Sequence, residues 1–173
     1  MVQTMSRAEE NQMRIDEQVI ELLTKKIECF LKYEEETKKL TANGEDAVER
    51  ITDALAVRQE LIGEIDEIDA DIRNVCEGAE DGRLLLDAAG NRCDYQRLTP
   101  EYQEVYQTGQ QVFQIITRIQ NEERLARASM EEVKNRFQKD IRQNRKVSKF
   151  SGYLKSMNYT EDVKKGFLYN AKR

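Results

Sequence analysis

The side chains that carry most enzyme chemistry are scarce in this sequence. The chain of 173 residues contains no histidine, the usual general base near neutral pH and the commonest metal ligand. Cys29, Cys76 and Cys93 make an odd count without Cys-x-x-Cys spacing, which argues against a disulfide framework or a zinc site. No glycine-rich phosphate loop and no nucleophile motif occurs either. We therefore expect three ordinary reduced thiols.

Carboxylates are the one abundant reactive group, with 33 Asp and Glu residues. They could supply an acid and base pair or a metal cluster, but no pair stands out from the solvated background. Glu21 with Lys25 and Glu34 with Lys38 have the spacing that supports an exposed helix face. Glu123 falls on an apolar seam, and we interpret it as a register-setting polar residue rather than a ligand. We predict no enzyme activity, no cofactor and no bound metal.

Long helices are the elements that must position these side chains. One proline and eight glycines leave long stretches uninterrupted, and apolar residues recur in steps of three and four. A first helix is predicted from the Ser6 and Glu9 capping box to about Leu40. A break at 41–44 follows, and a second helix is predicted over 45–76. The short break favours an antiparallel hairpin.

The helical spacing of apolar residues is interrupted between residues 77 and 99, where we predict a loop of some 20 residues with at most one helical turn. Thr99 and Pro100 then resemble an N-cap followed by proline at the first helical position. Apolar spacing predicts a third helix over 100–146, about 70 Å long against roughly 50 Å for the other two. The predicted fold class is all-α: an elongated antiparallel three-helix coiled-coil bundle with a long third helix. The predicted division is a bundle over 1–146 and a basic, partly flexible tail over 147–173.

The unequal lengths predict an overhang at the end of the third helix. Its apolar stripe, Val133, Phe137 and Ile141, would then face solvent, a partner chain or the tail folded back. Residues 133–173 hold 12 Lys or Arg and 3 Asp or Glu, a net charge of +9, whereas the preceding residues carry -14. The tail adds apolar residues among its lysines, including Phe150, Tyr153 and Leu154. We predict a capped helix over 160–165 within it, and a tail of this composition folds best onto something else.

Targeting signals give a simple expectation. The first ten residues carry no apolar core behind a positive segment, and no run approaches the roughly 18 apolar residues that a membrane span needs. We predict a cytoplasmic protein without a membrane span.

Three stretches resemble the flagellar type III export chaperones, the FlgN and FliT-like group. They are DALAVRQELIGEIDEIDADI in the second helix, IITRIQNEERLARASMEEVKNRFQKDIRQNRK in the third, and SKFSGYLKS with KGFLYNAKR in the tail. The resemblance covers roughly residues 15 to 173. It implies a small helical protein that holds a flagellar axial subunit, a hook-filament junction protein or the filament cap, before its export.

The resemblance also implies where partners bind. In the family, the client's C-terminal region is bound helix against helix, and the chaperone's C-terminal part also docks at the export gate. For this chain, the resemblance implies that the client contacts Val133, Phe137 and Ile141. Contacts with the export-gate component fall on Phe150 and Tyr153, with Leu154 beside them.

Two other function classes stay open. A structural coiled-coil dimer or adaptor would bury the stripe in a second copy, and a homodimer can coexist with client exchange. A nucleic-acid-binding protein is the weaker alternative, because a basic tail with aromatic residues can track phosphates and stack on bases. The isoelectric point near 5.1 and the lack of a recognised nucleic-acid-binding motif argue against a nucleic-acid-binding protein.

Overall fold

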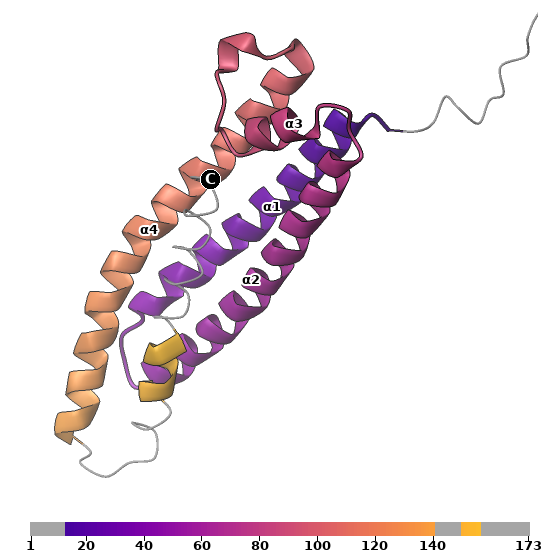
Figure 1. The fold of residues 1–173 in the computed structure, drawn as a ribbon. Helices are drawn as coiled ribbons and strands as arrows, with labels where there is room; N and C mark the ends of the chain where they lie inside the picture. The colour runs from indigo at the N-terminus through magenta and orange to yellow at the C-terminus, as the bar shows by residue number, and fades with distance from the viewer. Residues whose placement is uncertain (1–12, 141–149, 157–173) are drawn as a thin grey trace, which may run out of the picture.

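The computed structural model describes residues 13–140 and 150–156, and every regular element in these ranges is a helix (Figure 1). The predicted all-α class is confirmed. None of the described helices is long and apolar enough to span a membrane. The α-helices are α1 (Ile15–Lys38), α2 (Ala47–Glu77), α3 (Gly82–Ala89) and α4 (Pro100–Asp140); η1 (Lys39–Thr41) and η2 (Tyr95–Arg97) are 3₁₀ helices, and residues 150–156 form a further helical segment.

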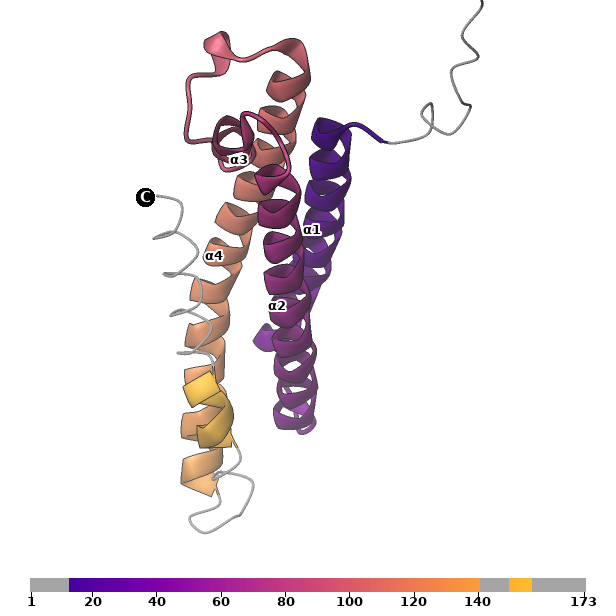
Figure 2. The ribbon, with the colours of Figure 1, turned by 45° about the vertical axis from the view of Figure 1, so that its right-hand side comes forward.

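The three long helices lie side by side, with α2 antiparallel to α1 and α4 (Figure 1). Helix α1 packs against both α2 and α4 along its length. We call the end that contains η1 the lower end and the opposite end, beside α3, the upper end. The segment 150–156 lies at the lower end in both views (Figures 1 and 2). The chain therefore returns from the end of α4 to the helices that precede it.

Local sequence signals place the boundaries of α2 and the start of α4 well. The second helix, predicted over 45–76, is observed as Ala47–Glu77. In the predicted break, Gly44 has a φ of 111°, a conformation that glycine adopts without steric cost. Helix α4 begins at Pro100 and continues through Ser129 without interruption, as the unbroken spacing predicts. The predicted first helix begins later than expected, because Arg14 is extended (φ -61°, ψ 151°) and α1 starts only at Ile15. The Ser6 capping box itself, residues 141–146 and the predicted helix 160–165 lie outside the described residues.

The prediction of a loop over 77–99 is wrong. Residues 82–89 form a helix of two turns, α3, and its Leu85 and Ala88 side chains are completely buried. The leucines and alanines of this stretch give α3 an apolar face, which packs against α4 and α2. A Cβ atom at Gly109 of α4 would lie 2.2 Å from the carbonyl oxygen of Ala89. Glycine at 109 thus lets the two helices approach backbone to backbone.

The long fourth helix extends beyond its neighbours at the lower end (Figure 1). With 41 residues against 24 in α1 and 31 in α2, α4 is about 60 Å long, compared with roughly 36 and 46 Å. The predicted difference in length is therefore present. The extra length of α4 packs against α3 near its start and against η1 and residues 150–156 near its end.

Candidate protein-binding site

The lower end has a hydrophobic core of its own, which we call the lower cluster. It forms where η1, the first turns of α2 and the second half of α4 meet. Its buried members are Leu40, Ala42, Ala47, Ile51, Ala54, Leu55, Ala126, Met130, Val133 and Phe150. Val48, Phe137, Tyr153 and Leu154 are partly buried against it. Four separate parts of the chain therefore build one apolar site.

This cluster contains five of the six residues that the sequence singles out for partner binding. Val133 and Phe150 are 2% and 3% exposed, and Phe137, Tyr153 and Leu154 pack at the edge of the cluster. The sixth, Ile141, lies outside the described residues. The sequence assigned the residues of the third helix and those of the tail to two different partners. The structure brings them together in one place.

The expectation of an unpaired stripe is not met for Val133. The helical segment 150–156 packs on the lower cluster through Phe150, Tyr153 and Leu154, which share one face because they are three and four residues apart. The sequence left three possibilities for the stripe: contact with solvent, with a partner chain or with the tail folded back. The folded-back tail is what packs on the cluster that contains Val133 and Phe137. Ser151, Gly152 and Ser156 are weak helix formers, but the packing of Phe150, Tyr153 and Leu154 against the cluster outweighs their low propensity.

A buried polar layer bounds the lower cluster from above. Nη2 of Arg58 on α2 donates hydrogen bonds to the hydroxyl of Tyr33 on α1 and to the carboxylate of Glu123 on α4. The Tyr33 hydroxyl donates to the same carboxylate at 3.4 Å, and the Arg58 guanidinium lies over the Tyr33 ring at 4.4 Å. Nε and Nη1 of Arg58 have no hydrogen-bond partner although the residue is 2% exposed. We call these three residues the Arg58 layer.

Sequence reasoning found only one member of this layer. Glu123 was interpreted as a register-setting residue, and its ion pair with a residue of another helix fits that role. Arg58 was missed. The signal was present, because Ile51, Leu55, Arg58, Ile62 and Ile65 follow one another in steps of four and three, which places an arginine on the apolar face of α2.

None of three comparisons, with protein-family models, with curated proteins and with solved structures, found a match to this chain. The resemblance to flagellar export chaperones therefore stays a prediction.

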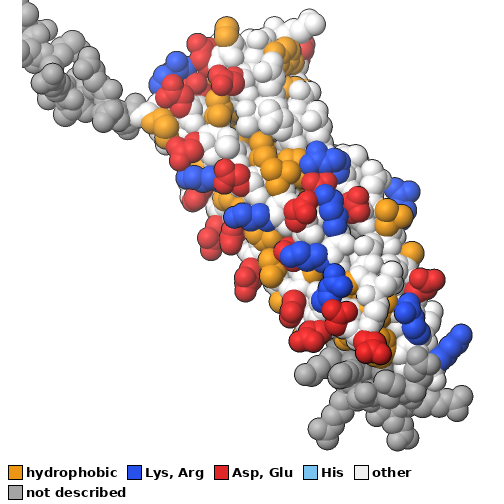
Figure 3. All heavy atoms as spheres, turned by 180° about the vertical axis from the view of Figure 1, so that it is seen from behind, with side chains coloured by type: hydrophobic (Ala, Val, Ile, Leu, Met, Phe, Trp, Pro, Cys, Tyr) orange, Lys and Arg blue, Asp and Glu red, His pale blue; other side chains and the backbone are white. Residues whose placement is uncertain are grey.

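The rest of the described surface offers no comparable apolar site. The exposed large hydrophobic residues are dispersed over four helices and the start of the chain: Met13, Leu31, Val57, Leu84 and Leu125. On the face opposite to Figure 1, hydrophobic side chains are scattered among charged ones of both signs (Figure 3). Within 13–140 and 150–156 no three His, Cys, Asp or Glu residues are grouped so that they could hold a metal ion.

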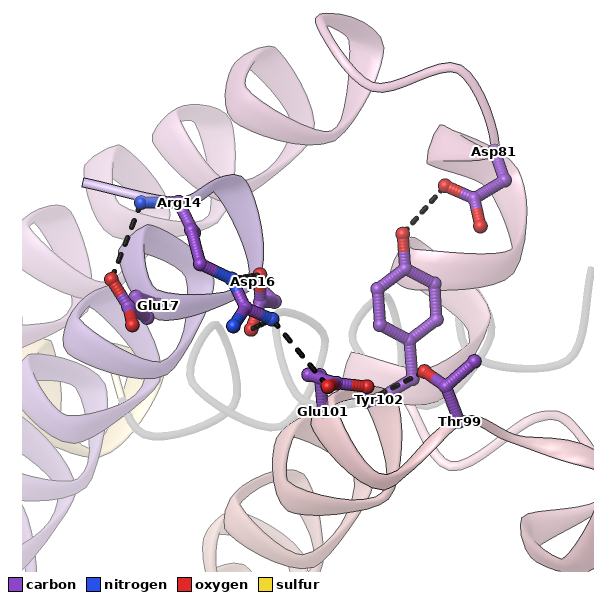
Figure 4. A network of polar contacts seen from close by, with 7 residues as sticks. All are labelled: Arg14, Asp16, Glu17, Asp81, Thr99, Glu101 and Tyr102. Carbon is purple, nitrogen blue, oxygen red and sulfur yellow. Dashed lines mark hydrogen bonds and ion pairs between the residues drawn. The ribbon is translucent and has the colours of Figure 1, made fainter. Parts of the chain in front are cut away.

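Polar contacts add to the hydrophobic packing at the upper end (Figure 4). The Tyr102 hydroxyl of α4 donates to Asp81 at 2.5 Å, just before α3 begins. Burial, together with that hydrogen bond, raises the pKa of Tyr102 above its ordinary value. Nη2 of Arg14, the residue just before α1, lies 3.9 Å from Oε1 of Glu101 at the start of α4. These contacts join the starts of α1, α3 and α4 to one another.

Proposed function

We propose that this chain is a chaperone that binds a helical segment of another protein on the lower cluster. The single observation behind the proposal is that a short, separate helix, residues 150–156, completes this core. A surface that accepts one helix through residues at i, i+3 and i+4 can accept another with the same spacing. The occupant in this chain thus indicates the ligand: an amphipathic helix with aromatic and leucine anchors.

Opposite charges at the lower end would orient such a helix. Lys134, Arg136 and Lys139 lie near the end of α4, and Asp46, Glu49 and Asp53 lie at the start of α2, so charges of both signs are available at the lower end. Complementary charges speed association and disfavour the reversed orientation more than they add affinity. The apolar anchors would supply most of the binding free energy.

The family resemblance suggests the identity of the client. It favours the C-terminal helices of flagellar axial proteins, held in the cytoplasm before type III export. Docking at an export-gate component through Phe150 would require residues 150–156 to leave the lower cluster, because the Phe150 side chain is buried there. Client binding in place of this segment would release it. The two partner sites predicted from the sequence would then be used one after the other.

Calorimetry with the full chain tests the proposal. Peptides of the C-terminal helices of hook-filament junction proteins and of the filament cap are titrated into the wild type and two variants. Phe137→Asp places a charge at the edge of the lower cluster and should weaken binding at least about tenfold. Leu125→Asp is the matched control on the same helix, because Leu125 is 63% exposed and away from the cluster. Its affinity should equal that of the wild type.

Two results would count against the proposal. If no axial-protein helix binds the wild type, the flagellar client is wrong and a purely structural helical protein becomes the leading interpretation. If a peptide binds but Phe137→Asp retains full affinity and wild-type circular dichroism, the lower cluster is not the binding site.

A further inference from the structure

The buried core of this protein is divided into two parts along the bundle axis. The lower cluster contains ten buried residues. A second set of 18 buried residues, which we call the upper cluster, comes from α1, α2, α3, α4 and the chain before α4. Its members are Val19, Leu23, Cys29, Phe30, Tyr33, Leu61, Ile62, Ile65, Ile72, Cys76, Leu85, Ala88, Ala89, Leu98, Val105, Val112, Ile115 and Ile119. Four of the ten residues in the lower cluster are alanines, and Phe150 is the only aromatic one among the ten. Since hydrophobic stabilisation scales with buried apolar area, the lower cluster contributes less than the upper one.

The Arg58 layer lies where the two clusters meet. On α2, Leu55 belongs to the lower cluster and Leu61 to the upper one, with Arg58 between them. On α4, Glu123 lies between Ile119 of the upper cluster and Ala126 of the lower one. The boundary therefore falls at the same level on both helices.

A polar boundary lowers the cost of separating the two halves. Two buried nitrogens of the Arg58 guanidinium, Nε and Nη1, have no acceptor, and a buried charge pair loses much of its hydration. When the lower half opens, water reaches the layer and hydrates these groups. An apolar layer in the same place would gain nothing from water and would resist opening.

We propose that the lower half of the bundle opens as a cooperative unit while the upper half stays folded, with the Arg58 layer as the boundary. The lower half comprises residues 40–55 and 126–137 with the segment 150–156. Proteins commonly open in such contiguous units, whose free energies of opening lie below that of global unfolding. The proposal concerns the chain without any partner, so it stands or falls independently of the proposed function.

Hydrogen exchange of backbone amides in the full-length chain tests this division. In the wild type, the amides of Ala54 and Met130 should exchange at least about tenfold faster than those of Ile65 and Val112, after correction for intrinsic rates. Equal exchange of the two groups, with one common dependence on denaturant, would overturn the proposal.

A variant with an apolar boundary tests the role of the layer. Tyr33→Phe, Arg58→Met and Glu123→Leu together replace the ion pair and its hydrogen bonds to Tyr33 by apolar side chains of similar size. The ratio of exchange rates should then shrink to within about threefold, because the two clusters become continuous. A ratio that stays at the wild-type value would show that the layer is not the boundary.

A second buried ion pair serves as the control. Lys26 of α1 and Asp69 of α2 pair at 2.6 Å beside the upper cluster. Lys26→Met with Asp69→Leu makes the same chemical change away from the boundary and should leave the ratio as in the wild type. If this variant also abolishes the difference, the effect is one of general stability and the proposal fails.

Discussion

Arg58 on α2 and Glu123 on α4 form an ion pair that crosses the bundle and is shielded from solvent on both sides. The two residues are 65 positions apart in the sequence. Their pairing fixes the level at which α2 and α4 face each other, because one residue shifted along either helix would leave a buried charge alone.

Removing one member of this pair should be costly. Arg58→Ala leaves the Glu123 carboxylate in the core without its cation, and we expect a loss of about 3–5 kcal/mol in the free energy of unfolding. Urea denaturation followed by circular dichroism measures it. Lys25→Ala is the comparison, since Lys25 pairs with Glu21 and both side chains are about half exposed, at 56% and 50%. Its loss should be far smaller, and equal losses would contradict this reading of the buried pair.

Gly152 offers a way to strengthen the segment that covers the lower cluster. A Cβ atom there would meet nothing within 4 Å, so Gly152→Ala should favour the helix by about 0.5–1 kcal/mol. If a client helix replaces residues 150–156, its measured affinity should fall about two- to fivefold. Gly63→Ala in α2 also meets no neighbour and should stabilise the bundle with unchanged affinity. Equal affinities in all three proteins would argue against competition.

Gly109 should tolerate no side chain. Because a Cβ atom would lie 2.2 Å from the Ala89 carbonyl oxygen, Gly109→Ala should push α3 away from α4 despite the better helix propensity of alanine. We expect a loss of about 1–3 kcal/mol in the free energy of unfolding. Thermal and urea unfolding measure it, with Gly63→Ala as the control of opposite sign. A stabilised Gly109→Ala variant would show that α3 is not held in this position.

Stability should fall in alkaline solution because of Cys76. Burial raises the pKa of this thiol from 9.0 to about 11. The unfolded chain therefore loses its proton first, and the contribution to stability is complete below pH 9 and is lost as the pH rises through 11. The difference in unfolding free energy between the wild type and Cys76→Ala should shrink by about 1–2 kcal/mol from pH 8 to pH 11. A difference independent of pH would mean that the thiol titrates normally.

Tyr102 should matter for the order of the 77–99 segment. Tyr102→Phe removes the hydrogen bond to Asp81, and we expect a loss of about 0.5–1.5 kcal/mol. Limited proteolysis between residues 77 and 99 should become faster, while the lower cluster stays protected. An unchanged rate of proteolysis would mean that the Tyr102 hydrogen bond does not order this segment and that the contact between Ala89 and Gly109 does.

The sequence by itself determined that the chain folds into three long helices, because a periodicity of three and four residues and the signals at helix ends are local properties of the chain. It determined the start of α4 at Pro100, the boundaries of α2 and the excess length of α4. It also singled out Val133, Phe137, Phe150, Tyr153 and Leu154 as residues with an apolar face to cover.

Only the tertiary structure decided what covers that face. Periodicity shows which side of a helix is apolar, but it does not say which distant segment packs there, and residues 150–156 meet Leu40 across more than a hundred positions. The same limit explains why α3 was taken for a loop, since its stability comes from burial against α4 rather than from its eight residues alone. Arg58 became a core residue only once Glu123 and Tyr33 were beside it, because a buried charge requires partners that no local pattern identifies.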